Sequence, residues 1–222
     1  MNKAVVFDMD GVLFDSERII SQIWREIAVI DRIDVNQMEI AIRKCTGLNH
    51  TDISIFFHRH FGSDFNYNEF RNRAAMMFHN KVDREGLPIK KGVYEILKYL
   101  SESTYKIGLA SSSSTESIHK NLKRADITDY FQVIVGGDMV EHSKPEPDIY
   151  LKACSSLGVN PEKSIAIEDS PNGIRSAKTA GMLPIMVPDM IQPSEEITAL
   201  LYRQYESLLD VMEHLKEIEN RA

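Results

Sequence analysis

The sequence predicts an α/β fold in which a parallel-sheet core carries an inserted helical cap. The first observation is the regular alternation of short apolar segments with amphipathic segments from Pro88 onward, which is typical of parallel strands joined by crossover helices. The second is a Val-rich run at Ala4–Phe7, which a long stretch without strand signals separates from that alternation. We therefore expect a core domain formed by residues 1–14 and 87–222, and a cap domain formed by residues 15–86.

The first expected strand, Ala4–Phe7, is short, apolar and rich in valine, as buried strands are. The stretch that follows has the spacing of amphipathic helices, in which apolar residues recur three and four positions apart. Ile19, Ile23 and Ile27 mark one such stripe. Turn signals divide the stretch into about four predicted helices. These helices are expected at residues 16–30, 36–45, 49–61 and 67–82.

Strands and helices alternate in the remainder of the chain. The predicted strands are residues 105–110, 132–135, 164–167 and 183–187. The predicted helices lie near residues 93–100, 115–124, 147–157 and 171–179, with a terminal helix over residues 208–218. Parallel strands bring their carboxyl ends to one edge of the sheet, where open α/β sheets bind ligands. Residues that follow these strands are therefore the candidates for a functional site.

The composition excludes several classes of protein. Of the 222 residues, 43% are hydrophobic and 27% are charged, which suffices for a proper core. The net charge of -7 offers no general attraction to nucleic acid or to an anionic membrane, so we expect neither as a partner. No apolar stretch approaches the roughly 20 residues that span a bilayer, and no signal sequence is recognisable. Cys45 and Cys154 are expected to be reduced, which favours a cytoplasmic protein, and we expect a monomer.

Asp8 and Asp10 follow the first predicted strand directly. Two carboxylates one residue apart repel one another unless a cation or a shared proton compensates, so the pattern is costly as mere structure. Gly11 then allows the chain to turn away from the strand. A solvated acidic turn is the alternative interpretation, but a pair of acids at a buried strand end favours a functional site.

Ser111 and Ser112 open a run of hydroxyl residues between the second strand and a helix. Hydroxyls and the free N–H groups of a helix N-terminus suit a phosphate, although most such serine runs merely cap the helix. Lys144 precedes two prolines that rigidify its loop. Taken alone, Lys144 would be interpreted as an exposed lysine in a turn.

Glu168 and Asp169 place two further carboxylates at the end of a third strand. Carboxylate oxygens, together with a backbone carbonyl and water, are the ligands that Mg²⁺ prefers. An acidic cluster with one lysine and one hydroxyl is what phosphoryl transfer requires, because the metal and the lysine neutralise the phosphoryl oxygens while a carboxylate attacks in line. The strand ends therefore predict a Mg²⁺-dependent phosphoryl-transfer site.

Together these motifs resemble those of the haloacid dehalogenase-like (HAD) hydrolases, and the resemblance covers the whole chain. It implies a Rossmann-like parallel-sheet core with the small four-helix cap of the β-phosphoglucomutase-like subgroup. The matching motifs are Asp8-x-Asp10-Gly11-Val12, Ser111, Lys144-Pro145, Glu168-Asp169-Ser170 followed by Gly173, and Ala180-Gly181-Met182.

The resemblance implies roles for the acidic residues. Asp8 is expected to be the nucleophile that becomes an aspartyl-phosphate, and Asp10 the general acid and then the general base. Mg²⁺ is expected to be held by Asp8, the carbonyl of Asp10 and Asp169. Glu168 is expected as a direct or water-mediated neighbour of the ion.

The resemblance also implies how a small phosphorylated metabolite is bound. Ser111, Ser112 and Lys144 are expected to hold the phosphoryl group. The cap is expected to supply specificity for the leaving group and to close the site to solvent.

The cap residues favour a phosphatase over a mutase. HAD phosphatases and phosphomutases retain the second aspartate, here Asp10. β-Phosphoglucomutases also have a cap histidine and a phosphate-binding cap arginine, and the corresponding residues here are Ile20 and His50. His50 is the expected cap contact to the substrate, but imidazole cannot reproduce the bidentate grip of a guanidinium. We therefore expect a sugar-phosphate phosphatase, with a mutase as the alternative and a non-catalytic metabolite-binding relative as a third hypothesis.

Overall fold

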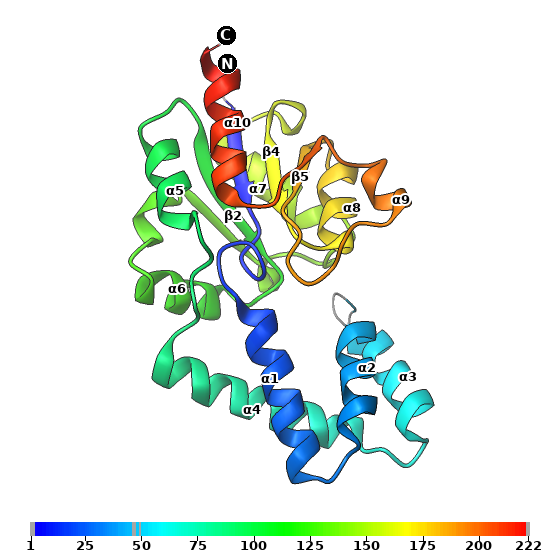
Figure 1. The fold of residues 1–222 in the computed structure, drawn as a ribbon. Coiled ribbons are helices and arrows are strands. Elements are labelled where there is room, and N and C mark those ends of the chain that lie inside the picture. The colour runs from blue at the N-terminus through cyan, green and yellow to red at the C-terminus, as the bar shows by residue number, and fades with distance from the viewer. Residues whose placement is uncertain (1–2, 46–47, 49, 221–222) are drawn as a thin grey trace. The chain divides into compact units, whose positions relative to one another are not determined.

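The computed structural model describes residues 3–45, 48 and 50–220. Within them, six parallel strands form one sheet in the order β3-β2-β1-β4-β5-β6, so that β1 is central (Figure 1). The strands are β1 (Ala4–Phe7), β2 (Lys106–Ser111), β3 (Val133–Gly136), β4 (Ile165–Glu168), β5 (Leu183–Met186) and β6 (Arg203–Gln204). The predicted α/β fold class, with a helical insertion between β1 and β2, is confirmed.

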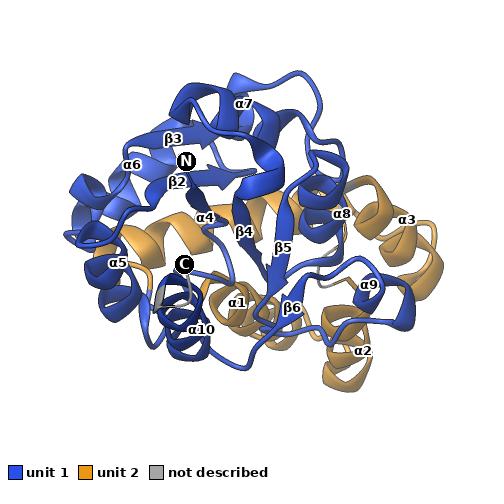
Figure 2. Ribbon diagram, turned by 90° about the horizontal axis from the view of Figure 1, so that it is seen from above, with its two compact units in different colours: residues 1–14, 88–222 blue, residues 15–87 orange. Residues whose placement is uncertain are grey.

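Helices cover both faces of the sheet. Figure 2 shows α7 (Asp148–Leu157) and α8 (Pro171–Thr179) on one face, with α5 (Val93–Ser101) and α10 (Leu208–Asn220) on the other. The remaining helical segments between β2 and the end of the chain are α6 (Thr115–Arg124), α9 (Glu195–Thr198) and the short 3₁₀ helices η1 (Thr128–Tyr130), η2 (Gly137–Met139) and η3 (Pro161–Lys163). A sheet covered on both faces explains why its central strands are continuous apolar runs.

The register of the central strands aligns their carboxyl ends. Val6 in β1 pairs with Gly108 in β2 and with Ala166 in β4. All four residues of β1 are fully buried. The N–H group of Asp8, the first residue after β1, donates to the carbonyl of Ile167 at 2.9 Å. The backbone after β1 is thereby tied to the end of β4.

The chain divides into two compact units, residues 1–14 with 88–222 and residues 15–87 (Figure 2). The second unit contains α1 (Ser16–Ile30), α2 (Val35–Cys45), α3 (His50–Phe61) and α4 (Tyr67–Glu85). Leu87 groups with the helical unit, one residue beyond the range 15–86 expected for it.

Aromatic side chains fill the core of the helical unit. Phe57 is fully buried, and its ring centroid lies 5.2 Å from that of Trp24 and 5.0 Å from that of Phe70. Such edge-on and tilted arrangements suit the quadrupoles of aromatic rings. Met76 of α4, by contrast, is 58% exposed. The unit therefore closes its core mainly with aromatic and isoleucine side chains.

Two short elements have no clear sequence signal. β6 spans only Arg203–Gln204, and both residues are exposed. α9 spans Glu195–Thr198, where Ser194 accepts a hydrogen bond from the N–H of Ile197 as an N-terminal cap. A strand of two polar residues and a helix of one turn show no hydrophobic period to detect.

No helix among the described residues combines the length and apolarity that crossing a membrane requires.

Candidate active site

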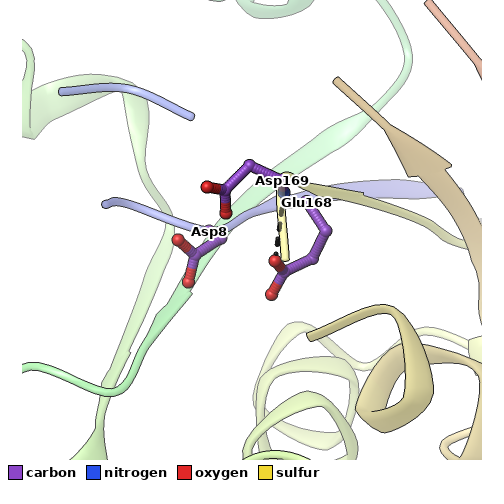
Figure 3. A group of neighbouring side chains, drawn as sticks. All are labelled: Asp8, Glu168 and Asp169. Carbon is purple, nitrogen blue, oxygen red and sulfur yellow. Dashed lines mark hydrogen bonds between the residues drawn. The ribbon is translucent and has the colours of Figure 1, made fainter. Parts of the chain in front are cut away.

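Four side chains converge at the carboxyl edge of the sheet. Asp8 follows β1, Ser111 ends β2, and Glu168 ends β4 with Asp169 directly after it. Because β2, β1 and β4 are parallel neighbours, their ends meet at one place. Figure 3 shows the carboxylates of Asp8, Glu168 and Asp169 gathered there. Three of the four acidic residues that the sequence predicts, Asp8, Glu168 and Asp169, therefore form one cluster.

Lys144 is buried against this cluster. Its Nζ donates to Asp8 Oδ1 at 2.5 Å, to Glu168 Oε1 at 2.6 Å and to the carbonyl of Ala110 at 3.1 Å. The Lys144 side chain is only 7% exposed. Three acceptors around one ammonium offset much of the cost of removing the charge from water. A lysine that would look exposed from its local sequence is thus held between two carboxylates.

Donors surround both carboxylate oxygens of Glu168. Oε1 accepts from Lys144 Nζ and, at 2.8 Å, from the hydroxyl of Tyr150. Oε2 accepts from the N–H groups of Asp169 and Ser170 at 3.2 and 3.3 Å, and from the Ser170 hydroxyl at 3.1 Å. Glu168 is fully buried. A buried carboxylate needs such donors, and Glu168 consequently fixes both Lys144 and the backbone that carries Asp169.

Two glycines make room for the acidic side chains. A Cβ atom at Gly173 would lie 1.8 Å from Glu168 Oε1, and one at Gly11 would lie 2.1 Å from Asp169 Oδ2. Gly11 also has a φ of +83°, a backbone conformation that L side chains rarely adopt. Any other residue at either position would displace a carboxylate of the site.

The three carboxylates fit a divalent cation. One oxygen from each of Asp8, Glu168 and Asp169 lies within 4.8 Å of the others. Hard oxygen donors in this number suit Mg²⁺ better than they suit a soft metal. Glu168 already accepts from donors at both oxygens, so Asp8 and Asp169 are the better candidates for direct ligands.

The charges of the site alter its protonation equilibria. Burial is the largest influence on Asp8, and the charges of Glu168 and Asp10 act in the same direction; although Lys144 opposes them, the pKa of Asp8 is raised to about 8. Burial tends to lower the pKa of Lys144, but the charges of Asp8 and Glu168 outweigh it and raise this pKa above its usual range. Burial and the neighbouring carboxylates thus both disfavour the ionised form of Asp8, and a bound cation would favour it.

Asp10 contacts a serine that the sequence did not single out. It is half-buried, and its Oδ2 accepts a hydrogen bond from the Ser113 hydroxyl at 3.0 Å. The N–H of Ser113 in turn donates to the hydroxyl oxygen of Ser111 at 3.1 Å, and Ser111 is 1% exposed. Ser112, expected to contact phosphate, is exposed. The serine run therefore links β2 to Asp10 through Ser111 and Ser113.

The N-terminus of α6 is partly occupied. Ser114 caps the helix by accepting from the N–H of Ser117. The N–H and hydroxyl of Thr115 donate to Asp138 Oδ1 at 2.9 and 2.7 Å. Asp138 thus holds one of the N–H groups that the sequence offers to a phosphate at this helix end.

The cap residue His50 is the first residue of α3, and its side chain lies outside the part of the chain that the structure describes. Ile20 is half-buried in α1. The contact expected between His50 and a substrate thus remains a prediction.

Sequence reasoning missed two side chains that touch the site, Ser113 and Tyr150. Ser113 stood within a run of hydroxyl residues in which the sequence does not distinguish one member from another. Tyr150 has a detectable signal, because it belongs to the inward face of α7, and a buried tyrosine hydroxyl requires a hydrogen-bond partner.

The chain has clear relatives among proteins of known sequence. A family profile described as haloacid dehalogenase-like hydrolase matches residues 5–187. The phosphorylated carbohydrates phosphatase of Thermotoga maritima is 32% identical over 180 residues, which cover 81% of this chain and 82% of that protein. The beta-phosphoglucomutase of Bacillus subtilis is 32% identical over 226 residues, covering 92% and 96%.

A solved structure supports the same relationship. A HAD family hydrolase from Deinococcus radiodurans, crystallised with bound phosphate and sodium, superposes with a TM-score of 0.76 at 27% identity. The match covers 97% of this chain and 96% of that one, so it includes both units.

Proposed function

Because this chain belongs to the haloacid dehalogenase-like hydrolase family, we propose that it hydrolyses a small phosphorylated metabolite through an aspartyl-phosphate on Asp8, with Mg²⁺. That it is a phosphatase of this family follows from the match along the chain and from its relatives. The proposal adds the route, the metal and the class of substrate.

The buried contact between Asp8 and Lys144, 2.5 Å long and beside Asp169, is the observation that carries this proposal. A phosphoryl group brings negative charge to a carboxylate nucleophile, so attack requires positive charge at the same point. Lys144 supplies one positive charge, and a cation held by the acidic cluster can supply more.

In the first half of the reaction, an Asp8 carboxylate oxygen forms a bond to phosphorus while the bond from phosphorus to the leaving oxygen breaks. Asp10 gives its proton to that leaving oxygen. Lys144 neutralises charge on the phosphoryl oxygens. The products of this half are the free alcohol and the aspartyl-phosphate.

In the second half, water gives a proton to Asp10, and the oxygen of that water forms a bond to phosphorus. The bond between phosphorus and the Asp8 oxygen breaks, which restores the carboxylate and releases orthophosphate. Asp8, Asp169 and the carbonyl of Asp10 would hold Mg²⁺, which when bound neutralises phosphoryl charge. Asp10 begins and ends the cycle protonated, so the two halves balance.

The expected substrate is a sugar phosphate, because the Thermotoga maritima relative acts on phosphorylated carbohydrates. A mutase is the second candidate, favoured by the 32% identity to the Bacillus subtilis beta-phosphoglucomutase. Ile20 and His50 count against it, because isoleucine carries no proton and imidazole offers no bidentate grip on a second phosphate.

The test is to supply sugar monophosphates with Mg²⁺ and measure orthophosphate. One sample holds β-glucose 1-phosphate with a trace of the 1,6-bisphosphate, and there glucose 6-phosphate is measured as well. Release of orthophosphate without isomerisation supports the phosphatase, whereas efficient isomerisation with little release would favour the mutase. The Asp8→Asn protein, which keeps the shape but loses the nucleophile, is the control and should show neither reaction.

A further inference from the structure

Tyr150 lies beneath the charged groups of the site but cannot itself reach solvent. It belongs to the first turn of α7 and is fully buried. Its hydroxyl donates to Glu168 Oε1 at 2.8 Å. The Nζ atom of Lys144 lies 5.0 Å from the centroid of the Tyr150 ring. Tyr150 thus contacts Glu168 through its hydroxyl and Lys144 through its ring.

The hydroxyl contact has a consequence for Lys144. Glu168 Oε1 has two donors, the Tyr150 hydroxyl and the Lys144 ammonium. The torsion that orients a glutamate carboxylate is soft, so its donors decide which way the oxygens face. Without the hydroxyl, Oε1 would depend on Lys144 alone, and the ammonium would be drawn from Asp8 toward Glu168.

Packing alone would not require a hydroxyl at this position. Tyr150 belongs to an apolar cluster that includes Ile149 and Ala153 of the same helix. Phenylalanine would fill that space and would still present an aromatic face to the ammonium. The feature that phenylalanine lacks is the hydrogen bond to Glu168.

We propose that Tyr150 is a positioning residue, which holds Glu168 so that Lys144 stays directed at Asp8 and at the phosphoryl group attacked there. The proposal rests on the proposed phosphatase function. It assigns the hydroxyl to the alignment of the ammonium in the transition state rather than to binding of the metabolite, so its loss should affect kcat more than KM.

The test variant is Tyr150→Phe, and the chain offers a closely matched control. Tyr99 also donates to a glutamate, to Glu219 Oε2 at 2.6 Å, and the Nζ of Lys216 lies 5.6 Å from its ring centroid. These residues belong to α5 and α10, away from the strand ends that form the site. Tyr99→Phe therefore removes the same kind of bond from a tyrosine, glutamate and lysine group without a catalytic neighbour.

We expect Tyr150→Phe to lower kcat about tenfold and to change KM by less than about twofold. Tyr99→Phe should leave both constants at the wild-type values. Thermal unfolding of both variants shows how much stability each hydrogen bond contributes. A wild-type kcat in folded Tyr150→Phe would overturn the proposal, as would an equal loss of kcat in both variants.

A second comparison uses Glu168→Gln, which removes the carboxylate charge to which the Tyr150 hydroxyl donates its hydrogen bond. In that background, adding Tyr150→Phe should change kcat by less than about twofold, because the two residues act through one contact. In the double variant the side chain at position 168 is neutral, so no buried carboxylate oxygen there lacks a hydrogen-bond donor. The comparison can therefore be made even if Tyr150→Phe alone does not fold. A further tenfold loss in the double variant would contradict the proposal.

Orthophosphate binding with Mg²⁺, measured by calorimetry, separates this proposal from the proposed function. If the wild-type protein binds orthophosphate but hydrolyses no phosphate ester, the proposed function fails. The role of Tyr150 is then judged with orthovanadate, whose five-coordinate adduct resembles the transition state: Tyr150→Phe should weaken vanadate binding several-fold more than Tyr99→Phe does. Equal affinity for vanadate in the two variants would overturn the role of Tyr150, whatever the outcome for hydrolysis.

Discussion

Asp10 differs from the other acidic side chains of the site in its surroundings. Asp8 and Glu168 are buried and bonded to Lys144, whereas Asp10 is half-buried and bonded to the Ser113 hydroxyl. A hydroxyl can donate to a carboxylate and can accept from a carboxylic acid, so this partner suits a group that changes protonation during the reaction. The environment of each carboxylate is thus consistent with the separate role proposed for it.

Replacing Asp10 with asparagine should separate the two halves of the reaction. p-Nitrophenyl phosphate has a leaving group that needs no proton, so attack by Asp8 should persist while hydrolysis of the aspartyl-phosphate stalls. Rapid mixing should show a burst of about one nitrophenolate per active site, followed by turnover at least about 100-fold slower than wild type. Unchanged steady turnover would remove Asp10 from its proposed role.

Asp169 should matter for the metal more than for the fold. We expect Asp169→Ala to raise the Mg²⁺ concentration needed for half-maximal activity by at least about tenfold, and a chelator to abolish wild-type activity. Asp138→Ala is the matched control, because Asp138 caps the start of α6 through Thr115 and does not belong to the acidic cluster. The control should lose a little stability and keep its Mg²⁺ requirement. Equal Mg²⁺ dependence in the two variants would argue against a metal at Asp169.

The connections between the units are held by backbone and side-chain contacts within the sheet-containing unit. Phe14 and Ile89 form an antiparallel bridge, and the N–H of Lys90 donates to the carbonyl of Leu13 at 2.9 Å. Lys90 Nζ also contacts Asp189 Oδ1 at 2.6 Å, in the loop after β5. The turn that follows Asp10 is thereby connected, through Lys90, to the loop after β5.

Breaking the pair of Lys90 and Asp189 should be costly. The Asp189 side chain is 3% exposed, and its Oδ2 has no hydrogen-bond partner among the described residues. Lys90→Met leaves that carboxylate buried without its cation, so we expect a loss of about 3 kcal/mol in denaturant unfolding, with partial recovery in Lys90→Met with Asp189→Leu.

The control for that experiment is Arg175→Met, which breaks the exposed pair with Glu196 and should cost less than about 1 kcal/mol. Equal losses from Lys90→Met and Arg175→Met would show that burial of Asp189 does not matter.

The elements differed in how far sequence could predict them. β1, β2 and β4 are buried apolar runs that end in polar residues, so both the strands and their functional ends were visible in the sequence. The exposed strand β6 was not, because its stability comes from pairing with β5 rather than from its own pattern. Contacts such as that between Ser113 and Asp10 depend on tertiary packing, which spacing along the chain cannot supply.

At the scale of the whole molecule, each compact unit contains one of the two cysteines, both of them buried and free. Cys45 ends α2 in the helical unit, and Cys154 lies in α7 of the sheet-containing unit. Burial raises the pKa of Cys45 to about 12 and that of Cys154 to about 11, although a hydrogen bond with Ser164 lowers the latter. Because the thiolate is the reactive form, each thiol should react only when its own unit opens.

Thiol labelling should therefore report whether the units unfold together. In Cys154→Ser, reaction of Cys45 with Ellman's reagent at pH 8 should be slow without denaturant and should accelerate at a lower urea concentration than reaction of Cys154 does in Cys45→Ser. The reason is size, because a smaller unit buries a smaller fraction of its surface and opens at a lower free energy. A single shared urea dependence would instead mean that the units open as one. Fast reaction of either thiol in native conditions would contradict the buried, protonated state that the structure gives it.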